Sequence, residues 1–138
     1  MKLSLDYHGV IDSNPGFFQE FASCGLWQEV HIVTGTQKTD EFIEKLLAIT
    51  NLSIVWWDKI YSLTDELHLE GHEYTVNMHG RKCYSEEIWN RAKAEYCRKH
   101  GIDLHIDDSE EYAKHFATPV MVYRHGDKND EKIKGESI

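Results

Sequence analysis

Short apolar runs alternate with segments of helical periodicity along the first part of this chain. Asn14-Pro15 predicts a helix start, since proline favours the first helical position, and Gly25 predicts the end of that helix. The strands are predicted over residues 2–5, 29–35 and 53–57, and the helices between them over 15–24 and 39–51. An order of strand, helix, strand, helix, strand is typical of a parallel sheet with right-handed crossovers.

The second half of the chain extends this pattern. Residues 58–84 alternate weakly around Glu70-Gly71 and predict a small hairpin or an irregular excursion. Ser85 and Asn90 are both candidate N-caps for the helix that follows. Further strands are predicted over 102–106 and 119–123, with a short helix after Ser109 between them. The prediction is therefore an α/β fold: one three-layer, Rossmann-like domain over residues 1–123, with a mainly parallel five-stranded sheet and a charged, frayed tail over 124–138.

Composition excludes several classes of function. The 138 residues carry a net charge of −9, which argues against a nucleic-acid binder because phosphate backbones need clustered Lys and Arg. No run of about 18 apolar residues and no signal peptide is present, so we expect a cytoplasmic protein with no membrane partner. Cys24, Cys83 and Cys97 lack C-x-x-C spacing and are expected to be reduced thiols. The nine histidines form no H-x-x-H or H-E-x-x-H pattern, so no zinc site is predicted.

Polar residues stand where three of the predicted strands end. These residues are Asp6, Thr34-Gly35 and Asp107-Asp108. Carboxyl ends of parallel strands lie on one rim of a sheet, where ligands of open α/β sheets bind. Three carboxylates at that rim would repel one another unless a cation lay among them, and oxygen ligands suit Mg²⁺. A threonine hydroxyl, a glycine amide and a lysine would complement a phosphoryl group there.

The same residues resemble the motifs of the haloacid dehalogenase-like superfamily of aspartate-nucleophile phosphatases. LSLDYHGVID is similar to the first motif, HIVTG to the second, and LHIDDSEEYA to the last. The resemblance covers residues 2–123. It implies a hydrolase in which Asp6 is the nucleophile and Thr34, with the amide of Gly35, binds the phosphoryl group. It also implies that Mg²⁺ is held by the carboxylates of Asp6, Asp107 and Asp108 and by the backbone carbonyl of His8.

The chain departs from the superfamily at His8. Phosphatases of the superfamily have a second Asp at this position, which acts as general acid and base. Histidine is competent in proton transfer near neutral pH, so His8 is a candidate catalytic residue. The alternative is a catalytically impaired member that binds phosphate, or a protein partner, without turnover.

The phosphate-binding lysine has two candidates. Lys93 falls in the first helical turn if Asn90 is the cap, whereas Lys82 precedes the helix if Ser85 is the cap. The run from Asn90 to Asp108 is more similar to short superfamily members with a lysine close to the acidic pair, which favours Lys93.

The spacing of the motifs leaves no room for a large α/β cap domain. One predicted helix separates the first two motifs, and residues 58–84 are too few for such a cap. We therefore expect a site with little or no cap. An open site suits bulky or varied phosphorylated substrates, or a partner subunit that acts as a lid. The expected partners are a small phosphorylated substrate and a second copy of the chain that covers the site in a homo-oligomer.

Overall fold

The computed structural model of the chain describes residues 1–49 and 55–124. A five-stranded sheet, all parallel, has the order β3-β2-β1-β6-β7. Its strands are β1 (Lys2–Leu5), β2 (Glu29–Thr34), β3 (Lys59–Ser62), β6 (Leu104–Asp107) and β7 (Val120–Val122). This architecture confirms the predicted α/β, Rossmann-like class, with the switch in strand order between β1 and β6.

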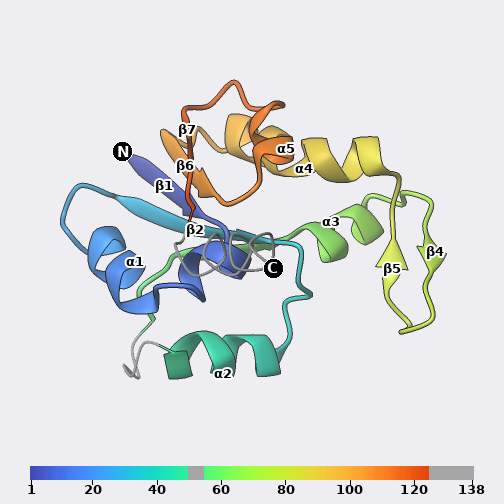
Figure 1. Cartoon of the computed structure of the whole chain (residues 1–138), viewed down its shortest axis with the longest axis horizontal. Helices are drawn as coiled ribbons and strands as arrows, with labels where there is room; N and C mark the ends of the chain where they lie inside the picture. Colours follow the sequence, from blue (N-terminus) through green and yellow to red (C-terminus); the bar gives the residue numbers. More distant parts are fainter. Residues whose placement is uncertain (50–54, 125–138) are drawn as a thin grey trace, which may run out of the picture.

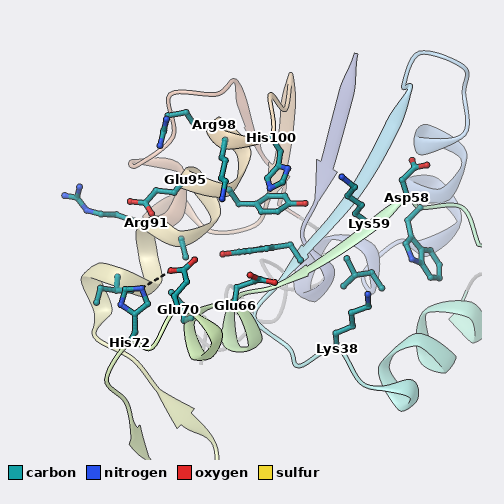
Figure 2. A pocket seen from close by; sticks show the side chains of 18 of the residues that line it. Lys38, Asp58, Lys59, Glu66, Glu70, His72, Arg91, Glu95, Arg98 and His100 are labelled. Carbon is teal, nitrogen blue, oxygen red and sulfur yellow. Dashed lines mark hydrogen bonds and ion pairs between the residues drawn. The ribbon is translucent and has the colours of Figure 1, made fainter.

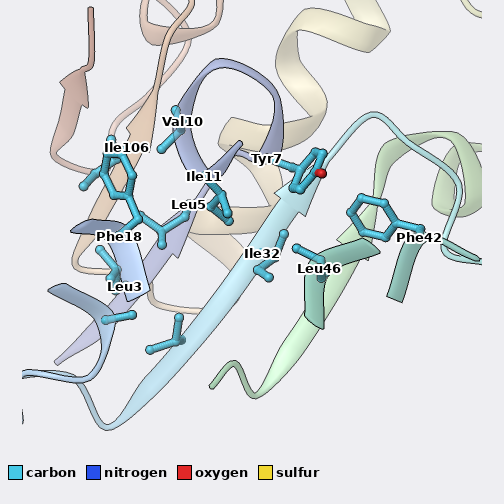
Figure 3. Packing of buried hydrophobic residues seen from close by; sticks show 12 residues of the cluster. Leu3, Leu5, Tyr7, Val10, Ile11, Phe18, Ile32, Phe42, Leu46 and Ile106 are labelled. Atoms are coloured by element: carbon cyan, nitrogen blue, oxygen red, sulfur yellow. The ribbon is translucent and has the colours of Figure 1, made fainter. Parts of the chain in front are cut away.

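Helices cover both faces of the sheet (Figure 1). They are α1 (Pro15–Ala22), α2 (Asp40–Ile49), α3 (Leu63–Leu69), α4 (Glu86–Lys99) and α5 (Glu110–Ala113). The face toward α1 and α2 is apolar, and Figure 3 shows Leu5, Ile32 and Ile106 of three adjacent strands packed with Phe18 and Leu46. A second cluster joins the opposite face to α3 and α4. No helix in the described ranges is both long and apolar enough to span a bilayer.

The third strand lies later in the chain than predicted. β3 begins at Lys59, whereas Val55, Trp56 and Trp57 form no strand and Val55 is 61% exposed. Residues 53 and 54 of the predicted strand lie outside the described part of the chain. Asp58 explains where pairing starts, because its amide donates to the carbonyl of Val30 at 2.8 Å and its carboxylate accepts from the Val30 amide at 2.7 Å. The two tryptophans instead pack against the core as half-buried side chains.

Residues 58–84 contain more regular structure than expected. β3 and α3 are followed by a hairpin of β4 (Thr75–Val76) and β5 (Lys82–Cys83), which stands at one end of the molecule beyond α3 and α4 (Figure 1). Gly71, with φ of 79°, lies just past the end of α3, so the predicted turn at Glu70-Gly71 is a helix terminus. The hairpin turns at Asn77–Gly80 instead, where the Asn77 side chain accepts the amides of His79 and Arg81.

Helix α4 resolves the choice between the two predicted caps. Ser85 is the N-cap, and its hydroxyl accepts the amide of Ile88 at 3.3 Å. Lys93 therefore lies about two turns inside the helix and not in its first turn. The last two strands overlap their predicted ranges, but β6 begins at Leu104 and not at residue 102, and β7 covers Val120–Val122 of the predicted 119–123. Ser109 caps α5 as expected. The predicted tail lies outside the described residues, apart from Arg124.

Candidate functional site

Three carboxylates meet at the carboxyl ends of β1 and β6. Asp6 follows the last residue of β1, Asp107 ends the neighbouring strand β6, and Asp108 comes next. One oxygen from each of the three lies within 4.8 Å of the others. Asp6 is 4% exposed and Asp107 is fully buried, so their charges are poorly solvated. The sequence prediction that these residues converge at one rim matches this geometry.

Lys93 enters the cluster from α4. Its ammonium lies 3.0 Å from Oδ1 of Asp6 and 3.0 Å from Oδ2 of Asp107. Burial alone would lower the pKa of Lys93, but the two carboxylates outweigh burial and raise it, so the side chain is a cation. The ring of Tyr112 lies 4.5 Å from the same ammonium and gives it an aromatic face.

The two bridged carboxylates differ in acidity. Burial raises the pKa of Asp6 to about 7, and the charges of Asp107 and Asp108 add to this effect, while Lys93 opposes it. Burial would also raise the pKa of Asp107, but its hydrogen bond from His105 and its contact with Lys93 lower it to about 2. Asp107 is thus the firmly ionised member, and Asp6 is the carboxylate whose charge most needs a further cation.

Gly9 makes room for Asp108. A Cβ added to Gly9 would overlap the carboxylate of Asp108, which would have to move. Gly9 also has φ of 82°, which other residues rarely adopt. The turn after β1, η1 (Tyr7–Ile11), therefore favours glycine at this position for its backbone, and a larger residue would also displace Asp108.

Thr34 and Gly35 lie at the carboxyl end of β2, beside β1. Thr34 is fully buried, and its hydroxyl accepts the amide of Thr36 at 3.1 Å. A Cβ on Gly35 would lie 2.9 Å from the ring of Trp89, so α4 packs directly on this glycine. Both residues are on the rim that holds Asp6, and their part in phosphate binding stays a prediction.

His8 lies outside the carboxylate cluster. Its Nε2 is 2.9 Å from the hydroxyl of Thr36 and its Nδ1 is 3.3 Å from Oδ2 of Asp12. The side chain is 63% exposed. His8 therefore ties the loop after β1 to the loop after β2, and both its ring nitrogens have partners other than Asp6.

The structure separates the two candidate lysines. Lys93 contacts Asp6 and Asp107, whereas Lys82 lies in β5 with its ammonium 5.4 Å from the centre of the Tyr74 ring. The sequence placed Lys93 in the first helical turn only if Asn90 is the cap, and that placement is wrong because Ser85 is the cap. Lys93 reaches the carboxylates from the third turn of α4 instead of the first.

His105 and Ser4, which contact the buried carboxylate of Asp107 directly and in turn, were not predicted. His105 Nε2 is 2.9 Å from Oδ2 of Asp107, and Ser4 Oγ is 2.6 Å from Nδ1 of His105. The sequence carries a signal for both, since residues two apart on a strand share a face, which relates His105 to Asp107 and Ser4 to Asp6. Their mutual contact follows from strand register, which pairs Ser4 with His105.

A separate cavity of about 900 Å³ runs along β3 and between α3 and α4 (Figure 2). Charged residues of both signs line it, among them Lys59, Glu66 and Arg98 (Figure 2). Tyr61 and Tyr96 also line it, and the centres of their stacked rings are 4.1 Å apart. None of the residues that line it belongs to the carboxylate cluster. The cavity is therefore distinct from the candidate site, which lies at the rim of the sheet.

Comparisons with protein-family models, with curated proteins and with solved structures find no match to this chain.

Proposed function

We propose that the chain is a Mg²⁺-dependent phosphohydrolase of the haloacid dehalogenase-like superfamily, with Asp6 as the nucleophile toward a small phosphorylated substrate. The observation that carries this proposal is the contact of Asp6 with Lys93 at 3.0 Å, with two further carboxylates beside it. This set lies at the switch point of a parallel sheet, where α/β proteins bind ligands. One nucleophile, one fixed cation and a place for a second cation are what phosphoryl transfer requires.

The hydrogen bonds of Asp6 leave one oxygen for attack. Oδ1 accepts the amide of Tyr7 at 2.9 Å and the ammonium of Lys93. Within residues 1–49 and 55–124, no hydrogen bond is made to Oδ2. Oδ2 would form a bond to phosphorus while the bond from phosphorus to the leaving oxygen breaks and that oxygen takes a proton. Water would then cleave the aspartyl phosphate, releasing inorganic phosphate and restoring the carboxylate.

The donor set fits Mg²⁺. Asp6, Asp107 and Asp108 offer hard oxygen ligands within 4.8 Å of one another, and an ion that keeps several waters needs only a few protein ligands. To hold the ion, Oδ1 of Asp6 would exchange its contact with Lys93 for the metal, which leaves Oδ2 for attack. The backbone carbonyl of His8 is the fourth proposed ligand. When bound, Mg²⁺ would neutralise charge on the phosphoryl oxygens. Lys93 would supply further positive charge, and Thr34 with the amide of Gly35 would donate hydrogen bonds to the same oxygens.

His8 is proposed to protonate the leaving oxygen and later to activate water. The exposed ring would have to exchange its contact with Thr36 or Asp12 for one with the substrate. These two contacts favour the alternative function, in which the protein binds phosphate or a protein partner without turnover.

Hydrolysis of p-nitrophenyl phosphate, with Mg²⁺ or with EDTA, tests the proposal. We expect Mg²⁺-dependent turnover by the wild type and none by Asp6→Asn. Asp103→Asn is the matched control, because Asp103 is an exposed carboxylate that precedes β6 at the opposite rim. Equal activity of Asp6→Asn and wild type would refute the nucleophile. Vanadate binding by a wild type that hydrolyses no ester would favour the alternative.

A further inference from the structure

The carboxylate cluster rests on a buried chain of polar side chains on β1, β6 and α4. Cys97 Sγ is 3.3 Å from Ser4 Oγ, which is 2.6 Å from His105 Nδ1, and His105 Nε2 is 2.9 Å from Asp107 Oδ2. Ser4, His105 and Asp107 are all fully buried. Buried polar groups without partners are costly, and here each of these groups has one.

We propose that His105, held by Ser4, is a positioning residue that sets the orientation of Asp107 toward the bound cation. This inference rests on the proposed Mg²⁺ site. It names which oxygen of Asp107 faces the cation and which side chains decide that choice.

The direction of the hydrogen bonds follows from chemistry. An ionised carboxylate only accepts, so Nε2 of His105 carries a proton and donates to Asp107. Nδ1 of the neutral ring is then the acceptor, and the hydroxyl of Ser4 donates to it. The remaining lone pairs of Ser4 face the thiol of Cys97. One tautomer of His105 thus satisfies every member of the chain.

These donors divide the two oxygens of Asp107 between different roles. Oδ2 accepts from both His105 and Lys93, which uses the two lone pairs of that oxygen. Oδ1 accepts one longer hydrogen bond, from the amide of Ser109 at 3.2 Å. Oδ1 therefore keeps a lone pair for a metal ion, and the geometry assigns it as the ligand atom.

His105 fixes a direction that Lys93 cannot fix. A lysine ammonium is a point charge on a flexible stem, whereas the imidazole ring is planar and rigid. The ring of His105 stacks on Phe116, with 4.8 Å between ring centres and 8° between planes. Phe116 sets the plane of the ring, Ser4 holds one nitrogen, and the other nitrogen aligns Asp107. Partners of this kind orient metal ligands in many sites.

Two substitutions at His105 separate positioning from simple burial. His105→Gln places an amide N–H close to the position of Nε2, whereas the shorter side chain of His105→Asn does not reach Asp107. Both bury one amide, so their effects on packing are similar. His31→Asn is the control, because His31 is equally buried, lies opposite Ser4 on β2 and contacts Tyr96 instead of the site.

The measurement is the affinity for Mn²⁺ alone, from the electron paramagnetic resonance signal of the free ion. We expect His105→Asn to weaken binding about 10- to 100-fold, the usual effect of losing such a partner. His105→Gln should stay within about threefold of wild type, and His31→Asn should bind as wild type does. Unchanged affinity in His105→Asn, or an equal loss in His31→Asn, would overturn the inference.

Two further results keep the test decisive. If circular dichroism shows that His105→Asn does not fold, Ser4→Ala replaces it in the test. We expect Ser4→Ala to weaken Mn²⁺ binding about 3- to 10-fold, and an unchanged affinity in this variant would overturn the inference. A wild type that binds no Mn²⁺ refutes the proposed metal site itself, and the inference with it. A wild type that binds while the variants bind equally well refutes only the role of His105.

Discussion

The ammonium of Lys93 lies 3.0 Å from Oδ1 of Asp6, and both side chains are almost completely buried. Helix α4 supplies the lysine and the end of β1 supplies the carboxylate, so the contact couples two layers of the fold at its switch point. A buried charge pair of this kind is costly to desolvate, and removing Lys93 would leave the Asp6 carboxylate without compensation, whereas Lys93 without Asp6 would keep its contact with Asp107. Lys93 and Asp6 should therefore affect both stability and ligand binding.

Substitution of Lys93 should weaken binding of phosphate analogues. Lys93→Ala removes the cation between Asp6 and Asp107, so an anion would meet three carboxylates with one positive charge fewer to offset them. We expect vanadate affinity, measured by calorimetry in Mg²⁺, to fall at least about tenfold. Lys82→Ala is the control, because Lys82 lies on the hairpin against Tyr74, and it should bind as wild type does. A larger loss in Lys82→Ala would assign the role to Lys82.

Mg²⁺ should stabilise the folded protein, because a ligand that binds only the native state raises stability by mass action. At ten times the dissociation constant the gain is about 1.4 kcal/mol, which for a chain of this size raises Tm by roughly 3–7 °C. Asp107→Asn should reduce the shift by weakening the site. Differential scanning fluorimetry with and without Mg²⁺ measures the shift in each protein. A Tm that millimolar Mg²⁺ leaves unchanged in the wild type and in Asp107→Asn alike would contradict the metal site.

The carboxylates of the site were predictable because their signals are local. Asp6 and Asp107 each stand at the end of a short apolar run, and parallel strands bring such ends together. The local sequence could not decide which lysine reaches the site, since Ser85 and Asn90 are both competent caps. The structure uses Ser85, and Lys93 reaches the rim because its long side chain extends back toward the start of α4.

The position of β3 and the role of His105 could not be predicted from the sequence alone. Val55 to Trp57 are more apolar than Lys59 to Ser62, yet the latter form the strand because β3 is at a sheet edge, where lysine is tolerated. His105 and Ser4 interrupt apolar runs in their strands. Their partnership depends on the register between β1 and β6, which periodicity within a single strand cannot specify.

Asp6→Asn should stabilise the metal-free protein near and above neutral pH. The folded-state pKa of Asp6 is raised from 3.8 to about 7, so the folded state holds this proton more tightly than the unfolded state does. The contribution of Asp6 to stability is therefore full below pH 3.8 and is lost as pH rises through about 7. The neutral amide of Asp6→Asn avoids that loss. We expect its free energy of unfolding at pH 8 to exceed that of the wild type by on the order of 2 kcal/mol.

Urea unfolding in EDTA at pH 5 and pH 8 measures this effect. The gain from Asp6→Asn should be clearly larger at pH 8 than at pH 5, because ionised Asp6 is the destabilising form. Asp103→Asn, at an exposed position, should show no such difference. A gain that is independent of pH, or a loss at pH 8, would mean that attraction to Lys93 outweighs burial and the neighbouring carboxylates.

The last prediction concerns proton transfer by His8. If His8 protonates the leaving oxygen, His8→Ala should lower kcat for alkyl phosphates by about 10²–10⁴-fold, the usual contribution of a general acid. The loss should be much smaller for p-nitrophenyl phosphate, whose leaving group needs little protonation. His8→Asp introduces the residue that phosphatases of the proposed superfamily have at this position and should retain or raise activity. Thr36→Val is the control for the structural contact, because it removes the hydroxyl 2.9 Å from Nε2 and leaves the imidazole in place. A rate that falls equally in Thr36→Val and His8→Ala would assign His8 to loop packing, and full activity of His8→Ala on alkyl phosphates would exclude it as the acid.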